Sequence, residues 1–367
     1  MTANFREKAL SVWKNVMNAF WKLKRELKRL RNQLLQLHWF VFGSLIRRYY
    51  DRRRSSLVKI HDGAQPARDK IAITLCFQPN GILPTFLAEL DHFVASGFSP
   101  VVVSNLPLLA RDRLALMERS LMVIERPNYG YDFGGYREGI LCLFERGIRP
   151  RNLILKNDSV WFPLWPDSDL LNRAVADDHD IFGIFLNSHG RKHRQTHLQS
   201  YFYSFNEKIV SSPEFQYYWQ NLFMTNNKHA VVRQCEVKLT DWFRSRGFTV
   251  GQLLDAEAMR VALKSLTDSE LLDCISYQVK VETRLEKNLR PLINNPQRNN
   301  WRRDIERLIE EGRFRNYYFI AHPHIIFGVL KSSLLKKDRQ MIYQVQRKEI
   351  VEKCYTDMML QVFSSEI

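Results

Sequence analysis

The segment 126–166 holds the residues of this chain whose types and spacing are most suggestive of chemistry. It reads RPNYGYDFGGYREGILCLFERGIRPRNLILKNDSVWFPLWP. An Asn-x-Gly turn opens a predicted helix, and an apolar strand follows that ends in Asn157-Asp158-Ser159. In an open α/β sheet, ligands bind outside the carboxyl ends of the strands. A helix start there offers backbone N–H groups to phosphate, and a carboxylate at the next strand end can hold a metal ion or a sugar hydroxyl. The combination is typical of a nucleotide-sugar site.

The turn and the helix start contain residues suited to a nucleotide. Gly130 lets the backbone pass close to a ligand, and Gly135 allows close approach at the helix start. Asn128 and Asp132 can hydrogen-bond a base or a ribose, and Arg137 could reach a phosphate. An ordinary helix N-terminus with Asp132 as its cap is an equally good interpretation of these residues alone.

The strand end supplies a single carboxylate. Asp158 could hold a divalent cation, Mg²⁺ or Mn²⁺, that neutralises a leaving diphosphate. Because Asn157 and Ser159 are neutral, Lys156 or Arg137 could instead supply part of the positive charge. An Asn-Asp-Ser turn without any function is common at strand ends.

The elements that must position these residues follow a regular alternation. Buried strands are predicted over 71–77, 100–104, 121–125 and 152–156, with helices over 82–95, 110–119 and 134–146. Such strand–helix units indicate parallel pairing with right-handed crossovers, a Rossmann-like sheet. After Pro166 the pattern loosens. We expect strands over 181–186 and 198–205, a polar loop over 188–196, helices over 213–223 and 236–246, a surface loop over 290–300 and an apolar block over 317–330.

Three motifs in order resemble the rhamnan-synthesis F family: NYGYDFGGY, then LKNDSVWFPL, then HLQSYFYSF with a following EFQYYW. Those proteins are similar to GT-A glycosyltransferases, in which an Asp-x-Asp motif occupies the strand end, and are implicated in building rhamnose-containing cell-surface polysaccharides. Glu236 in CEVKLT and His322-Pro323-His324 also fit the resemblance, which covers roughly residues 70–335. It implies a GT-A-like, Rossmann-type α/β fold, a mostly parallel sheet flanked by helices, with a nucleotide-sugar donor and a glycan or lipid-linked acceptor.

The resemblance also implies site roles. Asp158 and Glu236 are expected to be catalytic, Glu236 as the general base of an inverting transferase ahead of Asp241. The donor is expected to contact Phe77, Asn80, Asn105, Asn128, Gly130, Asp132, Gly135, Arg137, Lys156, Asn157 and Ser159. The acceptor is expected to contact His197, Ser200 and Tyr201, and a metal to be held by Asp158 with His322. Each has a plainer alternative: a solvated helix-face carboxylate, a half-buried strand or a structural histidine.

The charge of the chain is concentrated at its N-terminus. The net charge is +16 over 367 residues, and residues 1–60 hold 15 Lys and Arg against Glu7, Glu26 and Asp51. We therefore expect a basic amphipathic helical arm over 1–50, a polar linker over 51–70, a catalytic domain over 71–335 and a helical tail over 336–367. The five cysteines are far apart in the sequence and odd in number, which indicates reduced thiols in the cytosol and no zinc site.

An apolar stripe at helical spacing runs through the arm between basic residues, and Trp13, Trp21 and Trp39 add rings that favour a water–lipid boundary. Adsorption to an anionic membrane surface, a short coiled coil and docking on the protein's own body are all open. The apolar stretch is too short to span a bilayer, and no signal-peptide cleavage site follows it. A nucleic-acid arm is the least favoured interpretation, because no nucleic-acid motif accompanies the charge.

The leading hypothesis is a cytoplasmic glycosyltransferase, peripheral on the inner face of the membrane, that moves rhamnose or a related sugar onto a lipid-linked or nascent surface glycan. The runner-up is a non-catalytic scaffold of a glycan-assembly complex, favoured by the single carboxylate at 157–159.

Overall fold

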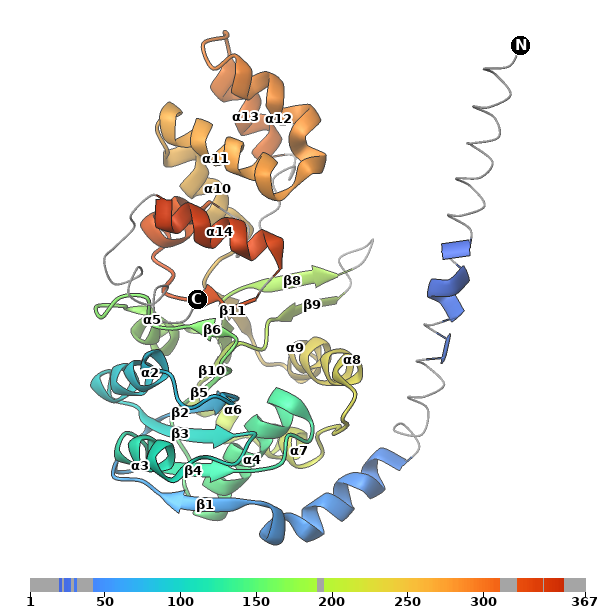
Figure 1. The fold of residues 1–367 in the computed structure, drawn as a ribbon, viewed down its shortest axis with the longest axis vertical. Coiled ribbons are helices and arrows are strands. Elements are labelled where there is room, and N and C mark those ends of the chain that lie inside the picture. Colours follow the sequence, from blue (N-terminus) through green and yellow to red (C-terminus); the bar gives the residue numbers. More distant parts are fainter. Residues whose placement is uncertain are drawn as a thin grey trace.

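A computed structural model describes residues 20–21, 23–27, 30–31, 42–189, 195–310, 322–338 and 340–352. Its centre is an eight-stranded sheet with the order β1-β4-β3-β2-β5-β10-β7-β11 (Figure 1). The strands are β1 (Lys59–Asp62), β2 (Lys70–Cys76), β3 (Ser99–Ser104), β4 (Met122–Glu125), β5 (Asn152–Lys156), β7 (Ile181–Gly183), β10 (Phe202–Phe205) and β11 (Val250–Gln252). Strands β4, β3, β2 and β5 are parallel, whereas β10 runs antiparallel to both β5 and β7.

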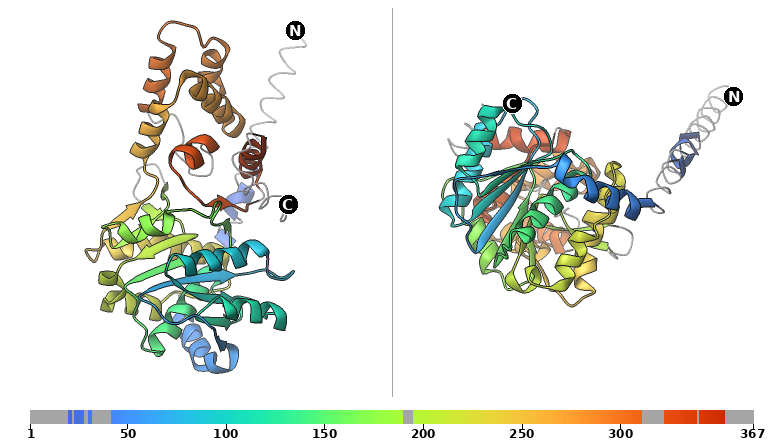
Figure 2. Two further views of the ribbon diagram at one scale, coloured as in Figure 1. Left: turned by 90° about the vertical axis from the view of Figure 1, so that its left-hand side faces the viewer. Right: turned by 90° about the horizontal axis from the view of Figure 1, so that it is seen from below.

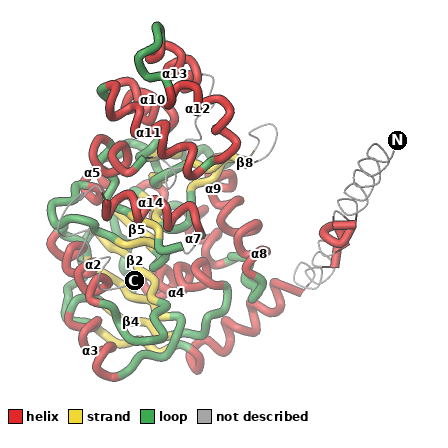
Figure 3. The backbone as a smooth tube through the Cα atoms, turned by 45° about the horizontal axis from the view of Figure 1, so that its top comes forward, coloured by secondary structure: helices red, strands yellow, loops and turns green. Residues whose placement is uncertain are grey.

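Helices cover both faces of the sheet, which explains why its central strands are apolar on both sides (Figure 3). Ile73 and Leu75 of β2 pack with the layer of α4 (Tyr131–Glu145), α7 (Pro213–Gln220) and α9 (Val237–Arg244). Cys76, one residue on, packs with α2 (Pro84–Ala95) and α3 (Ala110–Glu118) on the other face. The side-chain period of two therefore assigns each residue to a layer. The α/β class with a mostly parallel sheet flanked by helices is confirmed.

Beyond the parallel half, short elements complete the body. β6 (Val160–Trp161) pairs with β12 (Leu335–Lys336), and β8 (Leu186–His189) pairs with β9 (Gln195–Leu198). Residues 188–189 and 195–196 of the expected polar loop thus belong to paired strands, and residues 190–194 lie outside the described residues. The remaining helices are α5 (Leu170–Ala176), α6 (Glu207–Val210), α8 (Lys228–Val231) and the π-helix η1 (Val232–Glu236), which runs directly into α9.

A helical lobe stands beyond the side of the body where β8 and β9 lie, with α14 (Met341–Glu352) between it and the body (Figures 1 and 2). It contains α10 (Ala256–Ser265), α11 (Asp268–Val281), η2 (Thr283–Leu285), α12 (Glu286–Asn294) and α13 (Trp301–Glu310). Thr267 and Glu270 form a capping box at the start of α11. The loop expected over 290–300 is confined to 295–300, since α12 continues through Pro291. In the expected apolar block over 317–330, residues 317–321 lie outside the described residues, and His324–Val329 form the π-helix η3.

Residues 51–70, expected to be a linker, contain regular structure. A helix over residues 42–57 continues past the expected boundary, and β1 then pairs with β4 as an antiparallel edge strand. Tyr50 of the helix is buried in the core, and Asp51 pairs with Arg137. The sequence pattern does not predict this docking, because the helix buries only one narrow side and the edge strand β1 is largely exposed.

In the part of the arm before residue 42, the apolar side chains that the structure describes are exposed. Phe20, Trp21, Leu23, Leu27 and Leu30 are each more than half exposed. Among the described residues, no helix combines the length and the apolar character that a bilayer crossing requires.

Candidate functional site

The carboxyl ends of the parallel strands gather the expected acidic residues. Asp158 follows β5, and its Oδ2 accepts a 2.6 Å hydrogen bond from the backbone N–H of Phe77, which follows β2. The pKa of Asp158 is raised to about 6, mainly by burial and also by the nearby Asp132 charge, whereas the Phe77 N–H, Lys337 and Lys156 oppose the shift. A carboxylate with this pKa is ionised at neutral pH but is poorly solvated.

The start of α4 faces the same strand end. Gly130 is the residue before the helix, in the left-handed conformation at φ 82°, and no side chain caps it. Asp132 is therefore not an ordinary cap. Its Oδ2 accepts a 2.8 Å hydrogen bond from Asn157 Nδ2, while Asn157 Oδ1 accepts from both the N–H and the hydroxyl of Ser159. Burial raises the pKa of Asp132. The structure thus joins the two motifs of segment 126–166 through one asparagine.

Glu236 reaches this cluster from a different part of the chain. It is the last residue of η1, a π-helical turn of the kind often found at functional sites. Its Oε1 accepts a 3.2 Å hydrogen bond from the N–H of Ser200, whose carbonyl accepts one from the hydroxyl of Tyr136. Burial raises the pKa of Glu236, and the charge of Asp132 adds to the effect. Tyr136 is fully buried beneath the cluster, where the Asp132, Asp158 and Glu236 charges all help raise its pKa.

Lys336 completes the cluster and was missed by the sequence interpretation. Strand β12 pairs antiparallel with β6, so that Lys336 lies opposite Val160. Its Nζ donates a 2.9 Å hydrogen bond to Ser159 Oγ and lies 5.4 Å from the ring centroid of Tyr201. Burial lowers the pKa of Lys336, while Glu236 and Asp132 oppose that shift. The expected domain boundary at 335 falls inside this strand. No local pattern marks one lysine of a basic segment, so only the strand pairing reveals it.

Three expected donor contacts belong instead to the packing of the fold. Lys156 is fully buried and its Nζ lies 2.6 Å from Glu89 Oε2 on α2. Arg137 holds Asp51 with two hydrogen bonds of 2.8 and 2.9 Å. Gly135 lies against β2, where an added Cβ would come within 2.7 Å of a Leu75 methyl group.

These corrections have geometric causes. Strand alternation turns Lys156 toward the α2 layer, away from the side where Asn157 reaches Asp132. Arg137 lies five residues after Asp132, about 140° around α4 at the usual 3.6 residues per turn.

The remaining donor residues surround the strand ends. Phe77 is 46% exposed and Asn80 is exposed in the loop after β2, so both side chains can contact a ligand. Asn105 is buried, and its Oδ1 accepts a 2.5 Å hydrogen bond from Arg126. Asn128 Oδ1 is buried with no hydrogen-bond partner among the described residues. It could accept a hydrogen bond from a bound nucleoside.

The expected acceptor residues are less accessible. His197 on β9 and Tyr201 before β10 are both buried. Ser200 is half-buried and holds Glu236 through its backbone. Ser200 and Tyr201 thus contact the cluster, Tyr201 through a 3.4 Å hydrogen bond from the Asn157 N–H to its carbonyl, whereas His197 is buried on β9 opposite Asn187.

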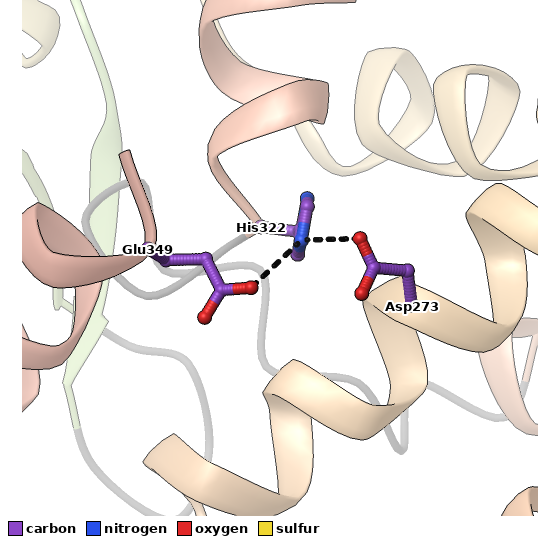
Figure 4. A group of neighbouring side chains, drawn as sticks. All are labelled: Asp273, His322 and Glu349. Carbon is purple, nitrogen blue, oxygen red and sulfur yellow. Dashed lines mark ion pairs between the residues drawn. The ribbon is translucent and has the colours of Figure 1, made fainter. Parts of the chain in front are cut away.

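His322 lies in a separate cluster, so the expected metal site of Asp158 with His322 is not assembled. Figure 4 shows His322 between Asp273 of α11 and Glu349 of α14, with Nε2 at 3.3 and 3.9 Å from their carboxylate oxygens. Its Nδ1 accepts a 3.2 Å hydrogen bond from the N–H of His324. A neutral His322 must then carry its proton on Nε2, facing the carboxylates. These contacts join the lobe to α14.

A divalent cation fits poorly at Asp158. Within the described parts of the chain, the grouping whose three potential ligand atoms lie within 4.8 Å of one another is Asp273, His322 and Glu349, not Asp158 with its neighbours. One oxygen of Asp158 already accepts the Phe77 N–H. Asn157 and Ser159 are neutral, and the ammonium of Lys336 occupies the adjacent position. Hard divalent cations bind where several anionic oxygens converge, which these side chains do not provide.

Comparison with known proteins agrees with the resemblance seen in the motifs. The family model described as rhamnan synthesis protein F matches residues 100–272. An uncharacterized protein of Sinorhizobium fredii is 36% identical over 334 residues, 90% of this chain and 87% of the relative. A virulence protein of Vibrio anguillarum is 29% identical over 128 residues, 34% of this chain and 39% of that protein.

Among solved structures, a mannosyltransferase from Pyrobaculum calidifontis in complex with GDP-Man and Mn²⁺ matches with a TM-score of 0.28 and 12% identity. The match covers 50% of this chain and 57% of that one.

Proposed function

The chain belongs to the rhamnan synthesis protein F family, and on that premise we propose that it is a glycosyltransferase that moves a sugar from a nucleotide-sugar donor to a glycan or lipid-linked glycan. Rhamnose or a related sugar is the candidate donor sugar. The observation that carries the proposal is the contact between the two motifs. Asp132 at the start of α4 and Asp158 at the end of β5 meet through Asn157 at the ligand-binding edge of a parallel sheet.

The cluster provides the groups that transfer needs. The acceptor hydroxyl oxygen forms a bond to the anomeric carbon, and the bond from that carbon to the diphosphate oxygen breaks, its electron pair staying on the diphosphate. The acceptor proton passes to a carboxylate, for which Glu236 is the candidate because its pKa is raised and Ser200 orients it. Asp158 holds a hydroxyl of the donor sugar. The exposed ring of Phe77 and the carbonyl of Asn128 suit the nucleoside.

The arm supports a peripheral position on the membrane. Its exposed apolar side chains, interleaved with basic residues, favour adsorption to an anionic surface, and we place the protein on the cytoplasmic face. An enzyme with a lipid-linked acceptor gains effective concentration from this location.

The neutral residues Asn157 and Ser159 favour a second candidate, a scaffold that keeps the fold without transfer chemistry. Turnover separates the two. Purified full chain is incubated with UDP-, GDP- and dTDP-sugars, and hydrolysed or transferred sugar is measured by mass spectrometry. An enzyme releases nucleoside diphosphate from one donor, and Glu236→Gln lowers kcat by roughly 100-fold or more.

Asp241→Asn is the matched control. Asp241 lies five residues further along on α9, and we expect its substitution to leave kcat unchanged. If every donor stays intact with the wild-type chain, and none of these nucleotides raises its melting temperature, the scaffold is the correct interpretation.

A further inference from the structure

The proposed reaction leaves a diphosphate whose charge must be neutralised. In a site with two convergent carboxylates, a divalent cation can do this. Here the strand end presents Asn157, Asp158 and Ser159, and the donor set around Asp158 does not fit such an ion. The cluster therefore needs another cation.

Lys336 has the required position. Pairing of β12 with β6 fixes its backbone opposite Val160, and its Nζ lies 2.9 Å from Ser159 Oγ. Ser159 donates to Asn157 Oδ1 over 2.6 Å, and Asn157 donates to Asp132 over 2.8 Å. A hydrogen-bonded chain thus runs from the ammonium across the strand end to the start of α4.

Burial lowers the pKa of the Lys336 ammonium group, and two nearby carboxylates oppose that shift. Glu236 and Asp132 lie close enough to favour the protonated form against the effect of burial. The position of Lys336 explains why the side chains at positions 157 and 159 are neutral. A carboxylate at Ser159 would form an ion pair with Lys336 and consume the charge that a phosphate could use.

We propose that Lys336 is the cation that meets the diphosphate of the donor, so that sugar transfer by this protein requires no divalent metal ion. This inference rests on the proposed function, and it adds a residue and a metal independence that the family does not by itself imply. Lys336 would hold the negative charge that develops on the leaving oxygen, as a preorganised cation in a site that largely excludes water.

Two readouts test the inference, one of them independent of turnover. The full chain in excess EDTA is titrated with inorganic pyrophosphate and with UDP, GDP and dTDP by calorimetry. Binding to wild type without metal is expected, and Lys336→Met should weaken it at least tenfold. Lys336→Arg, which keeps the charge, should restore most of it. Lys59→Met, on the exposed edge strand β1, is the matched control and should bind like wild type.

Turnover of the donor gives the second readout. EDTA should leave wild-type kcat unchanged, and Lys336→Met should lower it by about 100-fold, the range seen when one preorganised group is lost. Melting temperatures show whether each variant is folded. If Lys336→Met does not fold, Lys336→Arg still tests the inference, because it keeps the positive charge.

Activity or diphosphate binding that EDTA abolishes and Mn²⁺ or Mg²⁺ restores would overturn the inference while leaving the proposed function intact. Unchanged pyrophosphate binding by Lys336→Met would overturn it too. If the chain binds diphosphate without metal and requires Lys336 for this binding, but turns over no donor, then the diphosphate site is correct and the transferase proposal is wrong.

Discussion

At the scale of single residues, the site consists of carboxylic acids whose ionisation is disfavoured by burial. The pKa values of Asp132, Asp158 and Glu236 are all raised by burial. Such groups cost stability in the free protein, and they are typical of sites where a ligand supplies the missing partner. The cost can be measured at Asp158.

Asp158→Asn should abolish transfer and stabilise the protein. An aspartate carboxyl in water has an ordinary pKa of 3.8, and the pKa of Asp158 is about 6 in the folded protein, so the folded state binds the proton more tightly than the unfolded state. Its contribution to stability therefore falls as pH rises from about 4 through 6, and the cost is complete above pH 6. Asparagine removes the charge and can still accept the Phe77 N–H. We expect the free energy of unfolding at pH 7.5 to rise by up to about 3 kcal/mol.

Urea unfolding of wild type and variant at pH 7.5 and pH 4 checks this. The gain should shrink toward pH 4, where the wild-type carboxyl is protonated in the folded state. A variant that is less stable at pH 7.5, or a gain that does not depend on pH, would contradict the explanation.

At the scale of elements, the site depends on segments that join the sheet from outside the parallel half. The π-helix η1 delivers Glu236, and β12 delivers Lys336. The helix over 42–57 is joined to α4 through the ion pair of Asp51 with Arg137. Arg137 is 3% exposed and also donates to the carbonyl of Trp219. The pair therefore acts as a structural tie.

Arg137→Ala should destabilise the protein by about 3 kcal/mol, because it leaves Asp51 and buried carbonyl groups without their donor. Chemical unfolding measures the loss. Arg146→Ala removes another arginine of the same region, whose pair with Asp62 is exposed, and should cost less than about 0.5 kcal/mol. Equal losses in the two variants would show that Arg137 is no anchor.

At the scale of the whole molecule, the sheet edge with the acidic cluster, the helical lobe and the basic arm are three distinct features of the chain. The lobe is joined to α14 through the contacts of His322 with Asp273 and Glu349, away from the acidic cluster (Figure 4). Before residue 42, the arm carries aromatic and leucine side chains that are more than half exposed. We expect it to bind the membrane whether or not the site is active.

Liposome flotation tests this expectation. The full chain should float with vesicles rich in phosphatidylglycerol and stay unbound with phosphatidylcholine alone, and high salt should weaken binding because the attraction is partly electrostatic. A chain lacking residues 1–41 keeps the docked helix and should lose flotation. Replacing Trp21 and Leu27 with alanine preserves the charge and should weaken binding as well. Equal flotation by the truncated chain would assign membrane binding to the body.

Periodicity along the chain is enough to predict the parallel half of the sheet and the local character of segment 126–166. Strand 152–156 and the neighbouring helices were predicted within a few residues, because buried parallel strands and amphipathic helices have local periodicities. The meeting of Asp132 with the Asn-Asp-Ser turn also followed, since parallel strands end at one edge.

Which charged side chains face that edge depends instead on how distant segments pack together. Lys156 and Arg137 lie near it in sequence but turn into the packing, whereas Lys336 lies far away in sequence and is brought there by β12. A charged residue has the same local pattern whether its partner is a ligand, a buried glutamate or solvent. That partner is set by strand register and helix rotation, which depend on contacts between segments distant in the chain.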